Sequence, residues 1–344
     1  MGFSAISVAN GRAYTMGNAN EQDTVFCLGA KTGKEIWKHS YPAELGDKFF
    51  EGGTTGTPTV DGDRVFTLSR WGDVFCFEAD SGKVVWNRNV AKDAGAPVPG
   101  WGFGGSPTVH ENMLLLNVGE AGLALDKATG KTIWESAKKD AGYSTPLPYL
   151  ENGKWAVLLG SEKSYLGVDL KTGQERWRMK WLTEYGVNAA DPIPVGDRVL
   201  ISSGYGKGAA LLKITGQAEP EVIWKGKQLK TQMNSAVLVD GYLYGLDGNA
   251  GDTAKLKCVE FATGTEKWSY PRIGTGGVIA ADGKLIVTGS KGELFVLAAT
   301  PAEPKILARA QVLTGKCWTA PVLANGFIYC RNSTGDIVCV DVHK

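Results

Sequence analysis

A six-residue phrase that ends in tryptophan returns along this chain at nearly constant intervals. The first copy is Thr32-Gly33-Lys34-Glu35-Ile36-Trp37. Further copies end at Trp86, Trp134, Trp177 and Trp268, and a looser copy that starts at Thr215 ends at Trp224. Successive tryptophans of this series lie 49, 48, 43, 47 and 44 residues apart. Repeats of this length are typical of β-propeller blades and are longer than tetratricopeptide or ankyrin repeats.

Each repeat predicts four short antiparallel strands. In the second repeat, apolar segments at 57–60 and 64–68 are separated by Asp61-Gly62, a turn composition that supplies positive φ at a hairpin corner. A third segment at 73–77 leads into Ser81-Gly82, where glycine again permits a tight turn, and the fourth carries Trp86. Because short turns join consecutive strands, one repeat is a four-stranded meander.

The same succession of strands and turns occurs eight times. It predicts an all-β chain in which residues 1–344 form a single domain, an eight-bladed β-propeller of four-stranded antiparallel blades. No segment has the periodicity of an amphipathic helix, and no change of composition marks a second domain. The predicted blades start near Ser4, Thr57, Ser106, Thr145, Ala190, Ser235, Gly276 and Ala320.

The repeated tryptophans are expected to be structural. One blade cannot bury its own faces, so an indole from each blade would pack against the next blade while its N–H reaches a backbone acceptor. Cysteines share a second repeat position, which is Ala or Gly in other blades, and this pattern indicates a small buried side chain rather than a metal ligand. These cysteines are Cys27, Cys76, Cys258 and Cys339. Cys317 and Cys330 belong to one blade, and a contact between them stays open.

The eighth repeat is expected to be incomplete. It opens at Ala320, and its third strand ends at Asp341, with neither a Thr-Gly turn nor a Trp strand after it. One explanation is that the natural protein is longer and that residues upstream of Met1, which would also hold any export signal, supply the missing outer strand. The alternative is a three-stranded blade with an unpaired edge at 335–341 that is available to a partner strand.

Composition excludes several classes of function. The chain has 37 basic and 36 acidic residues, a formal net charge of +1, which argues against nucleic acid or an anionic lipid surface as a partner. No apolar stretch approaches the roughly 18 residues of a membrane span. The three histidines have no metal-ligand spacing, and we predict no metal centre from them. The segment 247–252 is rich in oxygen ligands for Ca²⁺, although Asp, Asn and Gly also dominate ordinary turns, which is the preferred interpretation.

Two segments carry a resemblance to a known family. Ala124-Leu125-Asp126 precedes Thr129–Trp134, and Gly167-Val168-Asp169 precedes Thr172–Trp177. This arrangement resembles the tryptophan-docking motif of pyrroloquinoline-quinone-type (PQQ-like) propeller repeats, and the likeness covers nearly the whole chain. The family includes quinoprotein alcohol dehydrogenases and the non-enzymatic outer-membrane assembly lipoprotein BamB, so the resemblance implies a fold and leaves the activity open. It also implies a periplasmic or otherwise extracytoplasmic protein, and we expect a monomer.

The candidate binding residues lie in loops that would line one mouth of a propeller channel. Large aromatic groups alternate there with amide and charged groups, which suits a planar or polyhydroxylated ligand. The basic members would attract an anion such as a tricarboxylate quinone, whereas the alternative is a set of ordinary solvated loop residues. The candidates are Arg70, Trp71, Trp101, Glu162, Lys163, Asn188, Tyr205, Lys207, Gln232, Asn234, Lys291, Trp318 and Arg331.

Two functions are compatible with these residues. The preferred hypothesis is an exported binding or scaffold propeller similar to BamB, which holds a protein, peptide or glycan. The other is a PQQ-dependent alcohol or sugar dehydrogenase, with quinone and Ca²⁺ near Trp101 or Trp318 and a metal and base site built from Asn188 and Asp191 with Glu51 or Glu162. Such dehydrogenases typically have adjacent cysteines that form a vicinal disulfide. This sequence contains no Cys-Cys and no C-x-x-C-H haem-attachment motif.

Overall fold

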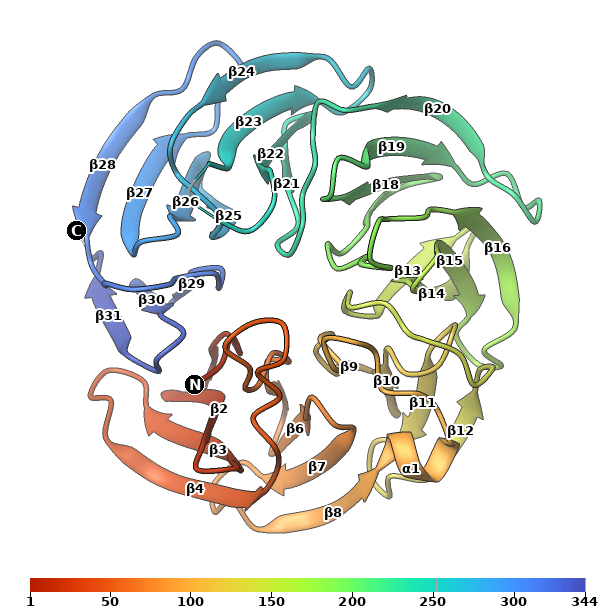
Figure 1. Cartoon of the computed structure of the whole chain (residues 1–344), viewed down its shortest axis with the longest axis vertical. Helices are drawn as coiled ribbons and strands as arrows, with labels where there is room; N and C mark the ends of the chain where they lie inside the picture. The colour runs from red at the N-terminus through yellow and green to blue at the C-terminus, as the bar shows by residue number, and fades with distance from the viewer. Residues whose placement is uncertain (252, 344) are drawn as a thin grey trace. The chain divides into compact units, whose positions relative to one another are not determined.

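The structure is a computed structural model that describes residues 1–251 and 253–343. Over these residues the chain has 31 strands and one short helix. The strands form eight antiparallel sheets that follow one another along the sequence, which is the fold of an eight-bladed β-propeller (Figure 1). The predicted fold class is therefore confirmed.

The eight sheets have the following strands. The first contains β1 (Ser7–Ala9), β2 (Arg12–Ala19), β3 (Gln22–Gly29) and β4 (Glu35–Pro42). The second contains β5 (Thr59–Asp61), β6 (Arg64–Leu68), β7 (Asp73–Glu78) and β8 (Val84–Asn89). The third contains β9 (Thr108–His110), β10 (Met113–Leu116), β11 (Leu123–Asp126) and β12 (Thr132–Glu135). The fourth contains β13 (Leu147–Glu151), β14 (Lys154–Gly160), β15 (Ser164–Asp169) and β16 (Glu175–Lys180).

The later sheets repeat this order. The fifth contains β17 (Ile193–Val195), β18 (Arg198–Ser203), β19 (Gly208–Lys213) and β20 (Glu221–Gly226). The sixth contains β21 (Val237–Val239), β22 (Tyr242–Asp247), β23 (Lys255–Glu260) and β24 (Glu266–Tyr270). The seventh contains β25 (Gly277–Ala281), β26 (Lys284–Thr288), β27 (Glu293–Ala298) and β28 (Ile306–Gln311). The eighth has three strands, β29 (Val322–Ala324), β30 (Phe327–Arg331) and β31 (Ile337–Asp341).

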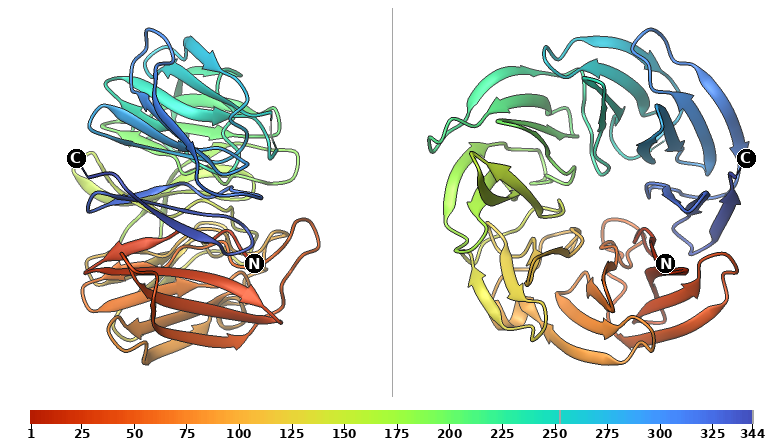
Figure 2. Two further views of the ribbon diagram at one scale, coloured as in Figure 1. Left: turned by 90° about the vertical axis from the view of Figure 1, so that its left-hand side faces the viewer. Right: turned by 180° about the vertical axis from the view of Figure 1, so that it is seen from behind.

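The chain divides into two compact units, and each is described by itself. Unit 1 comprises Met1–Pro148, Ala156–Glu162 and Leu166–Glu175, and unit 2 comprises Tyr149–Trp155, Lys163–Tyr165 and Arg176–Lys344. Each sheet is a local meander whose strands lie beside their sequence neighbours (Figure 2).

The position shared by the cysteines lies directly across the ladder from the repeated tryptophan. Cys27 is paired with Trp37, and Cys76 with Trp86, and the register shifts immediately after each pair. Both thiols are fully buried, as predicted for a small side chain beside a large one. For Cys339 the prediction of burial is wrong. This residue pairs with Tyr329 on β30 and is exposed, since the eighth sheet has no described fourth strand to place an indole against it.

The repeated glycine and the repeated tryptophan form one contact between successive blades. A Cβ on Gly130 would lie 2.7 Å from the ring of Trp86, the indole of the preceding blade. The Trp86 Nε1–H donates to the carbonyl oxygen of Lys127 at 3.0 Å, just before that glycine. The same pair of contacts joins Trp37 to Gly82 and Ala79, Trp134 to Gly173 and Leu170, and Trp224 to Gly264 and Phe261. The bare backbone of the Thr-Gly turn therefore provides both a flat surface for the indole and its hydrogen-bond acceptor.

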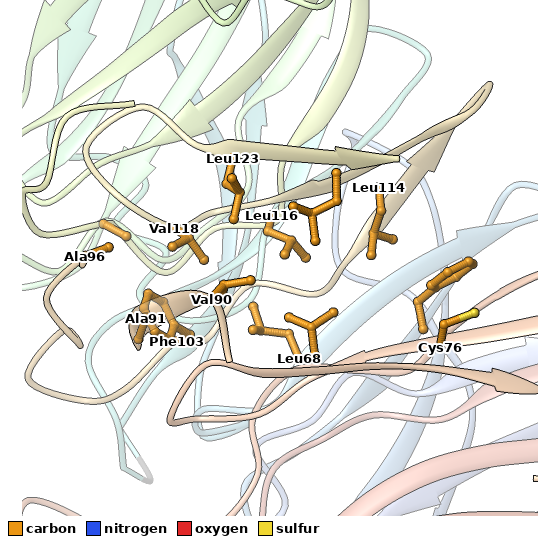
Figure 3. Close-up of a cluster of buried hydrophobic side chains, with 14 residues drawn as sticks. Leu68, Cys76, Val90, Ala91, Ala96, Phe103, Leu114, Leu116, Val118 and Leu123 are labelled. Atoms are coloured by element: carbon orange, nitrogen blue, oxygen red, sulfur yellow. The ribbon is translucent and has the colours of Figure 1, made fainter. Parts of the chain in front are cut away.

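Apolar side chains fill the space between neighbouring sheets. In unit 1, Leu68 and Cys76 of the second sheet meet Leu114 and Leu123 of the third sheet in one buried cluster (Figure 3). The cluster also takes in Val90 from the single helix, α1 (Val90–Ala94).

Helix α1 was not predicted from the sequence. The Asn89 side chain accepts a hydrogen bond from the Lys92 N–H and begins the helix, and Gly95 ends it at φ 63°. One turn is too short to show helical periodicity in a sequence. Within the described residues, no helix has both the length and the apolar character that crossing a membrane requires.

The glycine–indole contact makes a prediction about stability. Gly130 and Gly62 both have positive φ, but a Cβ on Gly62 would meet nothing within 4 Å. Gly62→Ala should cost about 1 kcal/mol of unfolding free energy, from backbone strain alone. Gly130→Ala should cost about 1–3 kcal/mol more, because its methyl group overlaps the Trp86 ring. Urea unfolding of the two variants measures the difference, and equal losses would contradict the proposed role of the contact.

Candidate functional site

The predicted site residues fall into both units. Arg70, Trp71, Trp101 and Glu162 belong to unit 1, and the remaining candidates belong to unit 2. Each set is therefore considered within its own unit.

In unit 1 the structure brings Arg70, Trp71 and Trp101 together. Arg70 lies in the turn between β6 and β7 and is only 3% exposed. Its guanidinium carbon lies 4.8 Å from the ring centroid of Phe50 and 5.4 Å from that of Trp71. Its carbonyl oxygen accepts a hydrogen bond from the N–H of Phe103 at 3.0 Å. We call the group formed by Arg70, Phe49, Phe50, Trp71, Trp101 and Tyr143 the Arg70 site.

Two glycines allow loops to close over the Arg70 side chain. A Cβ on Gly46 would overlap the guanidinium Nε, and one on Gly102 would overlap Arg70 Cγ. Both glycines have positive φ, 68° and 77° respectively. The segment 43–58, which contains Gly46, is anchored by a hydrogen bond of 2.7 Å from the indole N–H of Trp71 to the carbonyl oxygen of Glu44.

The outer part of the Arg70 site is an aromatic surface. Phe49 is 54% exposed, and its ring centroid lies 5.2 Å from that of Trp101, which is half-buried. Trp101 in turn meets the edge of Tyr143 at 6.1 Å between centroids. Burial raises the pKa of Tyr143 to about 12, and the charge of Glu162, another predicted residue, adds to this increase. The site thus has an exposed apolar face above a buried cation.

Sequence reasoning missed Phe49 and Phe50. A signal was available, since the 16 residues between β4 and β5 form a longer connection than compact domains usually use, and such loops are often functional. Their two adjacent phenylalanines have no strand pattern that would assign them to a core.

The Arg70 guanidinium is short of acceptors. Its Nε and Nη1 atoms are buried without a hydrogen-bond partner. Burial lowers the pKa of Arg70, while the negative charge of Asp23 opposes this decrease. Buried N–H groups almost always find an acceptor in a native protein, so these two atoms mark a place where a buried water would be bound.

Asp23 lies buried on β3 within the electrostatic reach of Arg70. Its carboxylate accepts a hydrogen bond of 2.8 Å from the Asn18 side chain. Burial raises its pKa from 3.8 to about 6, Asp73 adds to the increase, and the Asn18 hydrogen bond and Arg70 oppose it. Desolvation of the charged form therefore outweighs the nearby cation.

In unit 2 a second group of predicted residues surrounds the turn between β18 and β19. The Gln232 amide donates to the Tyr205 hydroxyl at 2.9 Å, and its oxygen accepts from the Ala250 N–H. Lys207 Nζ lies 4.7 Å from the ring centroid of Trp181. Asn188 is fully buried, and its side-chain amide donates to the carbonyl oxygen of Trp181 at 3.0 Å. The backbone N–H of Trp181 donates to the carbonyl oxygen of Lys163 at 2.8 Å.

The other predicted residues of unit 2 lie nearer its C-terminal end. Asn234 donates to the Trp318 carbonyl oxygen at 2.8 Å, and Lys316 Nζ lies 4.3 Å from the Trp318 ring centroid. Lys291 is exposed, and its carbonyl oxygen accepts from Gln311 at 2.7 Å. Arg331 is 4% exposed, and burial lowers its pKa to about 10.

The oxygen-rich segment 247–252 uses its described side chains for protein contacts. Asp247 is paired with Lys257 at 3.1 Å and with Lys230 at 3.5 Å, and Asn249 Oδ1 accepts from the Tyr205 N–H at 2.6 Å. Asp252 lies outside the described residues. Over residues 1–251 and 253–343, no group of three His, Cys, Asp or Glu side chains is arranged to hold a metal ion.

A tricarboxylate quinone needs accessible cations and an open aromatic face. Arg70 and Arg331 are both at least 96% buried, so a quinone carboxylate would not reach their N–H groups without rearrangement. Phe49 lies against Trp101, and Lys316 lies over Trp318. As placed, Arg70 with Trp101 and Arg331 with Trp318 therefore do not offer this cofactor an accessible cation and an open ring face.

Eight meander sheets with repeated glycine–indole contacts define a β-propeller built of PQQ-like repeats. The chain belongs to the family described as outer membrane protein assembly factor BamB, whose model matches residues 21–270. No curated protein matched the chain.

Solved structures show the same fold at low sequence identity. BamB from Moraxella catarrhalis is 15% identical, with a TM-score of 0.73 over 97% of this chain and 95% of that one. A quinohemoprotein alcohol dehydrogenase from Comamonas testosteroni is 14% identical, with a TM-score of 0.70 over 95% of this chain and 69% of the other. The computationally designed protein Ika8 is 12% identical, with a TM-score of 0.69 over 98% and 96%.

The raised pKa of Asp23 makes stability depend on pH. A carboxyl group whose pKa is raised from 3.8 to about 6 on folding favours the native state below pH 3.8, and this contribution is lost as the pH rises through 6. The difference corresponds to about 3 kcal/mol. Asp23→Asn removes the ionisation, so its unfolding free energy relative to wild type should increase by up to about 3 kcal/mol between pH 4 and pH 7.

Urea unfolding at four pH values between 4 and 7 measures this trend. Asp63→Asn is the control, because the Asp63 side chain is 83% exposed and its replacement should give no comparable trend. A difference between Asp23→Asn and wild type that stays constant with pH would contradict the assignment.

Proposed function

We propose that this protein is a binding or scaffold propeller that holds a polypeptide segment at the Arg70 site. The observation that carries the proposal is the exposed Phe49 packed on Trp101, next to Phe50, whose ring contacts the buried Arg70 guanidinium. We propose further that the protein acts outside the cytoplasm as a monomer and that its blades form a single domain in which the indoles serve as tryptophan-docking residues.

The chemistry of the Arg70 site suits an extended peptide. Aromatic and arginine side chains are enriched among the residues that carry most of the binding energy at protein interfaces. Aromatic side chains bury large areas with little loss of side-chain entropy. An extended peptide presents alternating side chains for Phe49 and Trp101. The buried Arg70 guanidinium supports this surface through its contacts with the rings of Phe50 and Trp71.

The family description supports a particular class of polypeptide. The matching family is described as an outer membrane protein assembly factor. Strands of outer-membrane β-barrels alternate apolar and polar residues. We therefore propose unfolded outer-membrane protein segments as the ligand, and a periplasmic location.

A labelled peptide tests this proposal. The probe is a fluorescein-labelled peptide with the alternating aromatic and polar residues of a β-barrel strand, and the measurement is fluorescence anisotropy. The double variant Phe49→Ser, Trp101→Ser should bind at least tenfold more weakly than wild type, because it removes two aromatic contacts of the interface.

The control variant is Trp155→Ser, which removes an aromatic residue that is 41% exposed in the other unit. Its affinity for the peptide should match that of wild type. Equal binding by the double variant and wild type, with both folded by circular dichroism, would exclude the Arg70 site as the peptide site.

The alternative function is a PQQ-dependent alcohol or sugar dehydrogenase. It is favoured by the structural similarity to the quinohemoprotein alcohol dehydrogenase over 95% of this chain. Because Arg70 and Arg331 are buried, we expect no saturable change in quinone absorbance when PQQ and Ca²⁺ are added, and no dye reduction with a panel of alcohols and sugars. Saturable quinone binding together with dye reduction would replace the scaffold proposal.

A further inference from the structure

Three lysines of unit 2 gather around one buried tryptophan. Trp181 follows β16 and is 1% exposed. Lys207 Nζ lies 4.7 Å from its ring centroid, and Lys225 Nζ lies 5.2 Å from it. Lys227 Nζ donates to the carbonyl oxygens of Gly206 and Lys207. We call Trp181, Lys207, Lys225 and Lys227 the Trp181 lysine cluster.

The register of the fifth sheet explains why these lysines meet. Lys225 is paired with Ala210 across the β19–β20 ladder, and Gly226 is paired with Ala209. Lys207 immediately precedes β19, and Lys227 immediately follows β20, so all three side chains start from the same end of this pair of strands. The cluster is therefore fixed by strand pairing.

Hydrogen bonds hold the indole in one orientation. The Trp181 Nε1–H donates to Ser203 Oγ at 3.2 Å, and the Ser203 hydroxyl donates to Asn188 Oδ1 at 2.8 Å. The Asn188 side-chain amide in turn donates to the carbonyl oxygen of Trp181 at 3.0 Å. This closed set of buried hydrogen bonds makes the ring a rigid platform for the ammonium groups.

The turn before Lys207 is also fixed. Tyr205 has φ 52°, a left-handed conformation that costs about 1–3 kcal/mol in a bulky residue. The Tyr205 N–H donates to Asn249 Oδ1 at 2.6 Å, which holds this conformation. A Cβ on Gly206 would meet nothing within 4 Å, so the backbone beside the cluster is open.

The three lysines of the cluster bring their positive charges close enough to act on one another. Over the described residues, no carboxylate forms an ion pair with any of the three lysines. The negative charge of Glu184 acts on the nearby tyrosines, where it raises the pKa of Tyr205 and Tyr185. Burial lowers the pKa of Lys207, and the charges of Lys225 and Lys227 lower it further. Cation–π contacts offset part of this repulsion, but an anion would remove it.

We propose that the Trp181 lysine cluster is a binding site for a phosphate group. A phosphate carries up to two negative charges and several acceptor oxygens, so it matches three neighbouring ammonium groups better than a single carboxylate does. Lysine binds phosphate as a compact point charge, and the indole holds Lys207 and Lys225 in place before the ligand arrives, which reduces the entropy lost on binding. The cluster shares no residue with the Arg70 site, and its four residues belong to unit 2.

Phosphate titration of the full chain tests the site. Inorganic phosphate is added at constant ionic strength, with chloride as the balancing anion, and binding is followed by ³¹P NMR line broadening. We expect saturable broadening in wild type and roughly tenfold weaker binding in Lys207→Met, which keeps the apolar stem of the side chain on Trp181 and removes the charge.

Two further variants keep the test decisive. Lys225→Met should weaken phosphate binding in the same direction and serves if Lys207→Met does not fold. Lys213→Met is the matched control, because Lys213 is an exposed lysine at the far end of β19, and its phosphate affinity should equal that of wild type. Equal phosphate binding in all four proteins, or no saturable binding in wild type, would overturn the proposal.

The phosphate group could belong to a lipid headgroup or to a soluble compound, and an experiment with vesicles distinguishes the two. Wild type and Lys207→Met are sedimented with phosphatidylglycerol vesicles and with phosphatidylcholine vesicles. Binding to phosphatidylglycerol that Lys207→Met loses would support a lipid headgroup as the ligand. Phosphate binding in solution without vesicle binding would support a soluble phosphate compound.

Discussion

The packing of an indole on the bare backbone of a glycine turn is the interaction on which this fold depends. Trp86 shows both of its parts, since its ring covers Gly130 and its N–H binds the carbonyl oxygen of Lys127. A side chain on the glycine would separate the two blades, and a smaller aromatic ring would leave the carbonyl group without its donor. Each copy of the repeated sequence phrase therefore takes part in two contacts between blades. Its glycine receives the indole of the preceding blade, and its tryptophan packs on the glycine of the following blade.

Trp177 shows how this contact can change without loss of the blade. Its indole N–H donates to the Tyr149 hydroxyl at 2.8 Å rather than to a backbone carbonyl. Tyr149 in turn donates to Glu151 at 2.7 Å, and Arg176 lies 3.7 Å from the same carboxylate. Burial, together with the hydrogen bond to Glu151, raises the pKa of Tyr149 well above its ordinary value, which keeps the hydroxyl protonated and available as a donor.

The fold could be predicted from the sequence because its determinants recur. Hairpin turns and the tryptophan series recur in successive blades, and a small residue lies 10 positions before Trp37, Trp86, Trp134 and Trp268. A blade that is hard to assign alone can therefore be assigned from the others. The features that were not predicted occur once. Helix α1 is a single turn, and the exposure of Cys339 follows from a sheet with three described strands.

The candidate site was less accessible to sequence reasoning for a physical reason. Loop residues were recognisable as aromatic or basic, but burial decides their chemistry, and burial depends on contacts between loops of different blades. Arg70 was expected to attract an anion from solvent, whereas the closure of two glycine-containing loops buries its guanidinium. The two phenylalanines that complete the site come from a segment without any repeat counterpart.

The spacing between each indole and its glycine also has a consequence for biosynthesis. The glycine that receives Trp37 is Gly82, and the one that receives Trp134 is Gly173, so each partner leaves the ribosome about 40 residues after its tryptophan. Because all strand pairing is local, a newly made sheet can form by itself and then dock as soon as the following turn emerges. Translation can therefore add sheets in order, with each waiting aromatic ring covered by the next segment of nascent chain.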